Sequence, residues 1–377
     1  MTITFLGDFM PSGDQSARDI KISRSLNKLL NRCDLRIATL ETAVGDYCEI
    51  SDSKMDKGEV AVWSKKEDLQ KLHDLNINVV TLANNHACDC GFEALIRLLS
   101  DLHNQGIETI GAGANLSEAM QPAIYEKDGE SIAIIGCCKD DPKSLGHLPF
   151  AGTNSGGLYR LDENLIIPQI RSYKQHFNYV AVLVHWGVEH KWLPELEDVE
   201  LSKKMIDAGA DIIVGGHPHH IQPKIDYKNR PVFYSLGNFF FPDFCLDNIS
   251  NVYYPDEEEL KRLPLFDWMA PDKRNFSMRY FWKYYGRIGM IATVNTDDFS
   301  KRSQYSISLY KQGRLSISHC QILHKVILAF FSRFVGKNES KVINKRITRI
   351  QYLFEYKILA LLFKRYQFFK YMNYHNW

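Results

Sequence analysis

The segment Asp211-Ile212-Ile213-Val214-Gly215-Gly216-His217-Pro218-His219 is the most informative part of the chain. Its short apolar run is rich in β-branched residues and is bounded by glycine, which predicts a buried strand over 212–214. The loop that follows carries two histidines on either side of a proline, which stiffens the backbone between them. A loop of this kind can direct both imidazoles to one small cation, so we interpret it as part of a metal site.

Outward from this segment, short apolar runs alternate with longer amphipathic ones. The predicted strands are Ile3–Leu6, Leu35–Leu40, Val79–Leu82, Ile132–Ile135, Val180–Val184, Ile212–Val214 and Val232–Ser235. The predicted helices are Gln15–Asn31, Lys66–Leu75, Gly91–Gly106, Glu163–His176 and Glu197–Ala208. Alternation of strands and helices predicts an α/β fold in which helices cover the faces of a sheet.

Composition and charge narrow the class of protein. The chain has 377 residues, of which 45% are hydrophobic and 24% are charged, as in ordinary globular proteins. Its net charge of +1 gives no overall field that would favour nucleic acid, which is not expected as a partner. The sequence has no export signal and no apolar run of about 18 residues that could span a membrane, so we expect a cytoplasmic protein.

The pattern changes in the last third of the chain. Residues 246–285 are rich in acidic, aromatic and proline residues without clear periodicity, and we interpret them as an irregular insertion. Two further stretches, Arg287–Asn295 and Gln304–Ser318, predict late strands. We therefore expect one domain over residues 1–320 and a basic, aromatic-rich helical tail over 321–377. From Lys325 to the end, 11 lysines and arginines face two acids.

Polar side chains follow five of the predicted strands, at the points where the strands end. They are Asp8, Glu41, the cluster Asn84-Asn85-His86, His185, and the pair His217 and His219. Each could be turn chemistry if taken alone, but ligands of open α/β sheets bind beyond the carboxyl ends of strands. We therefore expect a shared site. Carboxylates, imidazoles and an amide without a thiolate suit Mn, Fe or Zn, and a pair of such ions can activate a bridging water.

The order of these motifs resembles the CapA (poly-γ-glutamate and capsule synthesis) family, a branch of the calcineurin-like metallophosphoesterases. The resemblance covers about residues 1–242. The motifs that carry it are Gly7-Asp8, Leu40-Glu41, Leu82-Ala83-Asn84-Asn85-His86, His185-Trp186-Gly187-Val188-Glu189, Gly209-Ala210-Asp211, His217-Pro218-His219 and Tyr234-Ser235-Leu236-Gly237-Asn238-Phe239. The resemblance implies a four-layer αββα sandwich of the metallo-dependent phosphatase type with the metal site at one sheet edge. The helical C-terminal extension that the sequence predicts lies outside the resemblance.

The resemblance also implies a role for each motif residue. Asp8 and His219 would bind a first cation, Glu41 would bridge, and Asn85, His185 and His217 would bind a second. His86, with Asn85 beside it, would be the catalytic group that protonates a leaving alkoxide or stabilises a phosphate oxygen. The residues expected at the rim of the site are Asn84, Asp89, Trp186, Glu189 and Asn238. For Trp186, packing in the core is the alternative.

Three positions depart from the superfamily or family pattern. Met10 stands where the superfamily has a histidine two residues after the first aspartate, so only Asp8, Glu41 and His219 remain for the first cation. Glu41 replaces an aspartate, and Thr39 stands where CapA-like chains commonly have asparagine. The sequence therefore leaves open one or two divalent cations.

Two functions remain open at this stage. The first is a metal-dependent hydrolase, in capsule, exopolysaccharide or polyglutamate biosynthesis, that acts on a phosphoester or related anionic polymer or precursor. The second is a non-catalytic, metal-stabilised scaffold of a polymer-assembly complex.

The tail has two readings as well. Its apolar residues fall at helical spacing among lysines and arginines, so it predicts either a helix packed on the domain or a helix that contacts the anionic inner face of a membrane.

Overall fold

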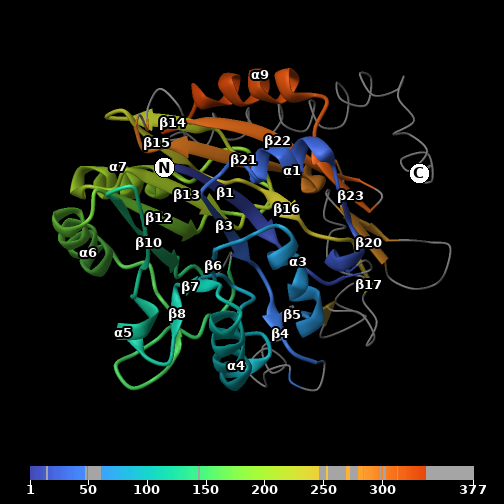
Figure 1. The fold of residues 1–377 in the computed structure, drawn as a ribbon, viewed down its shortest axis with the longest axis horizontal. Helices are drawn as coiled ribbons and strands as arrows, with labels where there is room; N and C mark the ends of the chain where they lie inside the picture. Colours follow the sequence, from blue (N-terminus) through green and yellow to red (C-terminus); the bar gives the residue numbers. More distant parts are fainter. Residues whose placement is uncertain are drawn as a thin grey trace.

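The computed structural model describes most of the first 336 residues. The described residues are 1–13, 16–46, 49, 61–142, 145–245, 252–253, 269–271, 279–282, 284–297, 299, 303–311 and 313–336. Within them, two sheets lie face to face, and helices cover both outer surfaces (Figure 1).

The first sheet has nine strands in the order β2-β23-β22-β21-β1-β3-β6-β7, with β16 paired to β1. Its strands are β1 (Thr2–Phe9), β2 (Lys21–Ile22), β3 (Leu35–Leu40), β6 (Val79–Thr81), β7 (Glu108–Ile110), β16 (Asn238–Phe240), β21 (Ile288–Asn295), β22 (Gln304–Lys311) and β23 (Arg314–Ile317). The central strands β1, β3, β6 and β7 run parallel, so the residues that follow them gather at one edge.

The second sheet has six strands in the order β14-β15-β13-β12-β10-β9. They are β9 (Ala123–Lys127), β10 (Glu130–Cys138), β12 (Tyr179–His185), β13 (Ile212–Gly216), β14 (Lys224–Tyr227) and β15 (Arg230–Phe233). The strands β10, β12, β13 and β15 run parallel to one another, while β9 and β14 pair antiparallel with β10 and β15 at the two edges.

Three hydrophobic cores separate four layers. Between the sheets, Phe5 and Ile37 of the first pack with Ile134 and Leu183 of the second. The nine-stranded sheet is covered by α1 (Arg24–Leu30), the turn η3 (Lys66–Leu69) with α3 (Gln70–Asp74), and α4 (Gly91–Asn104). The six-stranded sheet is covered by α5 (Leu116–Ala119), α6 (Glu163–His176) and α7 (Leu196–Ala208). These layers confirm the αββα sandwich expected from the sequence.

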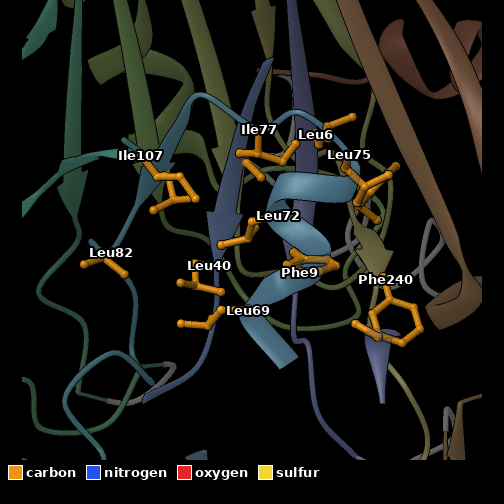
Figure 2. Close-up of a cluster of buried hydrophobic side chains, with 14 of the residues drawn as sticks. Leu6, Phe9, Leu40, Leu69, Leu72, Leu75, Ile77, Leu82, Ile107 and Phe240 are labelled. Carbon is orange, nitrogen blue, oxygen red and sulfur yellow. The ribbon is translucent and has the colours of Figure 1, made fainter. Parts of the chain in front are cut away.

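Figure 2 shows the core beneath α3 in detail. Leu72 of α3 and Leu75, which directly follows α3, pack with Leu6 and Phe9 of β1, and all four side chains are buried. The ring of Phe9 lies 5.8 Å from that of Phe240 on β16, centroid to centroid. This core fixes β1 between its neighbours, and β1 carries the first acid of the candidate site.

One predicted helix, Gln15–Asn31, is wrong in part. The described residues form the short turn η1 (Ala17–Asp19), the strand β2, and α1. The hydroxyl oxygen of Ser23 accepts a hydrogen bond from the backbone N–H of Leu26, so a new helix begins after Ser23. The extended residues before it pair with β23, as when Lys21 N–H donates to the carbonyl of Gly313. Tertiary pairing therefore overrides the helical spacing.

The remaining elements are short. They are β4 (Ala43–Val44), β5 (Ala61–Ser64), β8 (Ala112–Gly113), β11 (Gly157–Leu158), β17 (Phe244–Cys245), β18 (Val252–Tyr253), β19 (Met269–Pro271), β20 (Arg279–Trp282) and the turn η4 (Tyr284–Arg287). Four of these lie wholly within 246–285 or reach into it, the segment that the sequence predicts to be an irregular insertion. The rest of that segment lies outside the described residues.

The helix α9 (Gln321–Ser332) begins the expected C-terminal extension and lies over β14 and β22, at the top of Figure 1. The side chains on its inner face are buried, among them Ile327, Leu328 and Phe331. The ring of Phe331 meets that of Trp192 edge-on, at 4.5 Å between centroids. Residues 337–377, which include most of the predicted tail, lie outside the described residues. Among the described residues, no helix is long and apolar enough to cross a bilayer.

Candidate metal centre

The site lies where the carboxyl ends of the two sheets meet. Asp8 lies near the end of β1, Glu41 directly follows β3, and Asn85 and His86 lie in the loop after β6. The six-stranded sheet delivers three histidines: His185 ends β12, and His217 and His219 follow β13. Segments separated by up to about 200 positions thus converge on one buried cluster, as the sequence predicts.

The two acids at the centre are fully buried, and three of their four carboxylate oxygens have no hydrogen-bond partner among the described residues. Asp8 and Glu41 are each 0% exposed. Oδ1 of Asp8 and both carboxylate oxygens of Glu41 have no hydrogen-bond partner among the described residues. Burial raises the pKa of Asp8 to about 7, and burial together with the negative charge of Asp8 raises the pKa of Glu41. Two adjacent carboxylates in this environment require protons or a cation to be stable.

The three histidines lie around these acids, and burial favours the neutral form of each imidazole. Nε2 of His185 and Nε2 of His219 each lie 3.5 Å from Oε1 of Glu41, and Nδ1 of His219 lies 3.7 Å from Oδ2 of Asp8. Burial lowers the pKa of His217 to about 4 and that of His219 to about 3, and it also lowers the pKa of His185. At neutral pH their lone pairs are therefore available to a metal ion.

These ligand atoms form two groups that share Glu41. One atom each from Asp8, Glu41 and His219 lies within 4.8 Å of the others, and the same holds for Glu41, His185 and His217. Oδ1 of Asn85 lies 2.9 Å from Nε2 of His185 and can join the second group. The grouping is the one that the resemblance implies, and the mixture of oxygen and imidazole donors around unpartnered buried carboxylates fits divalent cations.

Asn238 fixes the orientation of His219. Its amide nitrogen donates to the carbonyl of Gly286 at 2.8 Å, so its oxygen faces Nδ1 of His219, also at 2.8 Å. Nδ1 must then carry the proton, which leaves the lone pair of Nε2 directed toward Glu41. Asn238, which the sequence places at the rim, therefore lies behind His219 and orients it.

His86 forms a pair with Asp89 beside the acids. Nδ1 of His86 donates to Oδ2 of Asp89 at 2.7 Å, and the same oxygen accepts from the backbone N–H of Val62 at 2.7 Å. On the other side of the ring, the amide nitrogen of Asn85 lies 3.1 Å from Nε2 of His86. The carboxylate of Asp89 thus sets the tautomer of His86 and leaves Nε2 facing the cluster.

The backbone of the histidine loop is held in an uncommon conformation. His217 has φ of 94° and His219 has φ of 50°, values that side-chain-bearing residues seldom adopt. Gly216 precedes them because a Cβ there would lie 2.8 Å from Oδ1 of Asp8. Strain concentrated in a ligand loop is typical of functional sites.

Two predicted rim residues have structural roles. The amide nitrogen of Asn84 donates to the carbonyl of Leu40, and its oxygen accepts from the backbone N–H of His86, so it ties two site loops together. Trp186 is only 1% exposed, stacks on Tyr234 and donates its indole N–H to the carbonyl of that residue. Trp186, which directly follows β12, therefore packs in the outer core, the alternative to a position at the rim.

Three aromatic or imidazole side chains at the site were not predicted. The rings of Phe241, Trp282 and His190 lie 5.1, 5.3 and 6.2 Å from that of His219. His190 directly follows the motif that contains Glu189, and this adjacency was a usable signal. Trp282 comes from the segment interpreted as an irregular insertion, where no periodicity indicated its position.

A four-layer sandwich with a carboxylate and imidazole cluster between its sheet ends defines a fold of the metallo-dependent phosphatase type. Residues 2–243 match the family model described as "Bacterial capsule synthesis protein PGA_cap". The match covers more than half of the chain, and the chain belongs to this family.

Curated relatives agree with this assignment. The chain is 38% identical over 184 residues to the "PGA biosynthesis protein CapA" of Bacillus subtilis, covering 48% of this chain and 47% of the relative. It is 28% identical over 255 residues to the "Capsule biosynthesis protein CapA" of Bacillus anthracis, covering 64% and 60%. A "Probable polyglutamine synthesis accessory protein" of Mycobacterium tuberculosis is 25% identical over 56% of each chain. The chain thus spans about half to three fifths of the relatives it matches.

Similar solved structures are more distant. A hypothetical protein from Thermus thermophilus is 14% identical, with a TM-score of 0.42 over 84% of this chain and 97% of that one. The sulfate thiohydrolase SoxB of the same genus is also 14% identical, with a TM-score of 0.34 over 62% of this chain and 51% of that one.

Proposed function

We propose that the protein is a divalent-metal-dependent hydrolase of capsule or polyglutamate biosynthesis, acting on a phosphoester or a related anionic polymer or precursor. One observation supports this proposal most directly. Glu41 is buried, neither of its carboxylate oxygens has a hydrogen-bond partner in the described part of the chain, and it belongs to both groups of potential ligands. A carboxylate shared in this way is the arrangement that two-metal hydrolytic sites use. Mn, Fe and Zn suit the donor set, and one or two ions are expected.

The residues of the site fall into two groups, those that would hold cations and those that would transfer a proton. Asp8, Glu41, Asn85, His185, His217 and His219 would hold the cation or cations, which when bound supply Lewis acidity and lower the pKa of a bound water. Asp89 accepts the proton on Nδ1 of His86, so Nε2 carries the lone pair of the neutral ring and takes up a proton when the ring becomes an imidazolium. When protonated, that nitrogen can hydrogen-bond an anionic oxygen of the substrate or give its proton to a leaving alkoxide. Asp89 stabilises the imidazolium during this transfer.

The substrate class rests on the names of the relatives. Those names concern capsule, PGA and polyglutamine synthesis, and they suggest an anionic polymer or one of its precursors for this chain. A metal-stabilised scaffold of an assembly complex remains the alternative function. The pair of His86 and Asp89 favours the hydrolase, since a scaffold has no need of an oriented proton donor.

Metal titration of metal-stripped protein, run alongside hydrolysis of bis(p-nitrophenyl) phosphate, tests the proposal. We expect Mn²⁺ to bind and to produce turnover that His86→Ala lowers without weakening Mn²⁺ binding. Tight binding with no turnover in either protein would favour the scaffold. Absence of cation binding would contradict both functions.

We also propose that the outer face of α9 contacts an anionic membrane surface. Ile322, Val326 and Phe330 share this face and are 80, 61 and 43% exposed. Lys325 and Arg333 lie among them, and no acidic residue occurs between Gln321 and Gly336. Apolar side chains flanked by cations complement an anionic bilayer, on which the protein would be peripheral at the cytoplasmic face.

Sedimentation with phosphatidylglycerol vesicles tests this contact. Ile322→Ser combined with Val326→Ser and Phe330→Ser should abolish binding, because the apolar face is lost. Ile124→Ser removes a similarly exposed side chain, 50% exposed on β9, and should bind like the unchanged protein. Equal sedimentation of the triple variant and this control would refute the proposal.

A further inference from the structure

Glu189, which the sequence places at the rim without a role, lies within ligand distance of the metal cluster. It belongs to the loop that follows β12. One of its carboxylate oxygens and one ring nitrogen each from His217 and His219 lie within 4.8 Å of one another. This group takes one histidine from each of the two groups that share Glu41. Glu189 therefore faces both cation positions at once.

Glu189 approaches the cluster from the open side. The side chain is 36% exposed, whereas Asp8 and Glu41 at the base of the cluster are fully buried. A ligand on this side can complete a coordination shell whose inner half is already built. It is also the side from which a substrate must enter.

The inner ligands leave the first position incomplete. Asp8, Glu41 and His219 supply three donors, and Met10, two residues beyond Asp8, offers only a thioether to hard or borderline cations. Zn²⁺ binds four ligands in most sites, and Mn²⁺ prefers six. Charge is also unbalanced, since two divalent cations carry four positive charges and the two inner carboxylates offset only two of them. A third carboxylate would add a ligand to the first position and offset one more positive charge.

The loop that carries Glu189 is tied to the histidine loop. The backbone N–H of His190 donates to the carbonyl of Pro218, which lies between His217 and His219. The ring of His190 stacks on that of His219 at 23° between planes, and its Nε2 lies 3.5 Å from Oε2 of Glu189. His190 thus holds the carboxylate near the cluster.

From this geometry we infer that Glu189 is a cation ligand that closes the metal centre on its open side. The inference deepens the proposed function and rests on it. It accounts for how the site can retain a first cation without the histidine that Met10 replaces. A carboxylate at the entrance is also the ligand best placed to yield to an incoming anionic substrate oxygen.

Mn²⁺ binding to Glu189→Gln tests the inference, with Glu200→Gln, an exposed acid on α7, as the matched control. Calorimetry should show two ions in the unchanged protein and the control. In Glu189→Gln we expect one site to weaken by at least about tenfold, as for loss of a group that tunes a metal site. The electron paramagnetic resonance signal of a coupled Mn²⁺ pair should be replaced by that of isolated Mn²⁺.

The outcomes separate this inference from the proposed function. If Glu189→Gln binds Mn²⁺ with the stoichiometry, affinity and spectrum of the control, Glu189 is not a ligand and the inference is wrong, while the metal centre stands. If the unchanged protein binds no Mn²⁺, or a single ion that Glu189→Gln retains unaltered, the inference is also wrong. In the case of no binding at all, the proposed function fails with it.

Discussion

The two sheets contribute different chemistry to the same site. The nine-stranded sheet delivers oxygen donors, namely Asp8, Glu41 and Asn85, whereas the six-stranded sheet delivers the imidazoles of His185, His217 and His219. Burial acts on the two sets in opposite directions. It raises the pKa of the acids and lowers the pKa of the histidines.

Neither set is complete without the other. In both, burial disfavours the charged form, so the metal-free pocket favours protonated acids and neutral imidazoles. A divalent cation reverses the preference of the acids and uses the neutral imidazoles as they are. The packing of one sheet on the other is therefore also the assembly of the metal centre.

Substitution of the shared acid should have the largest effect. Glu41→Gln keeps the size of the side chain but removes the charge that both ligand groups use. We expect cation affinity to fall by more than about 100-fold, since loss of groups that merely orient ligands already costs about 10–100-fold. Hydrolysis should drop to background. Calorimetry with Mn²⁺ checks this, and Glu126→Gln, an exposed acid on β9, should behave as the unchanged protein.

His86 lies on the oxygen-donor sheet but is expected to act on protons. His86→Gln should lower turnover by about 10²–10⁴-fold, the usual contribution of general acid–base catalysis. Cation affinity should not change, because Asn85 and the other ligands remain. Parallel measurement of turnover and Mn²⁺ binding separates the two roles. A matching loss of affinity would show that His86 supports the metal instead.

Asn238 orients an imidazole of the other sheet, so its loss should be smaller. Asn238→Ala frees His219 to rotate and should weaken cation binding by about 10–100-fold. Asn104→Ala on the surface of α4 serves as the control. If Asn238→Ala binds Mn²⁺ as tightly as this control, packing alone fixes His219.

The smallest expected effect is on the pH dependence of stability in the metal-free protein. The histidine pKa values are lowered on folding, so the unfolded chain binds more protons below about pH 6.5 and stability falls as the pH is lowered. The pKa values of Asp8 and Glu41 are raised, so stability is also lost as the pH rises toward about 7.

The three histidines outnumber the two acids, so maximal stability of the metal-free protein is expected near pH 6.5, roughly the ordinary histidine pKa. Mn²⁺ should raise the melting temperature more at pH 8 than at pH 6, because it stabilises the ionised acids. Thermal melts at both pH values check this. An equal increase at the two values would show that the acids are ionised without the metal.

Much of the fold could be predicted because its strands are short, apolar and β-branched. Each predicted strand has a counterpart, and the helix Glu163–His176 has the predicted limits. The segment Gln15–Asn31 was mispredicted because β2 forms through pairing with a strand almost 300 residues away. Local periodicity carries no information about such a partner, although Ser23 was a readable helix start.

The ligands could be predicted because each follows a strand, and parallel strands bring their ends together. The residues that orient or surround the ligands could not be predicted in the same way. Asp89 and Asn238 act through hydrogen bonds whose geometry depends on loops, and Trp282 arrives from a segment without periodicity. Trp186 lies in the outer core because a residue next to a ligand at the end of a strand points to the opposite face. That alternation was available from the sequence.

The contact between Phe331 of α9 and Trp192 has a practical consequence for protein production. Trp192 also packs on His220 and Tyr285, directly beyond the loop that carries Glu189. A shortened protein that ends before Gln321 would expose the indole of Trp192 to solvent. It would also remove the packing that supports the loop carrying Glu189. A protein that ends after Gly336 keeps the contact between Phe331 and Trp192.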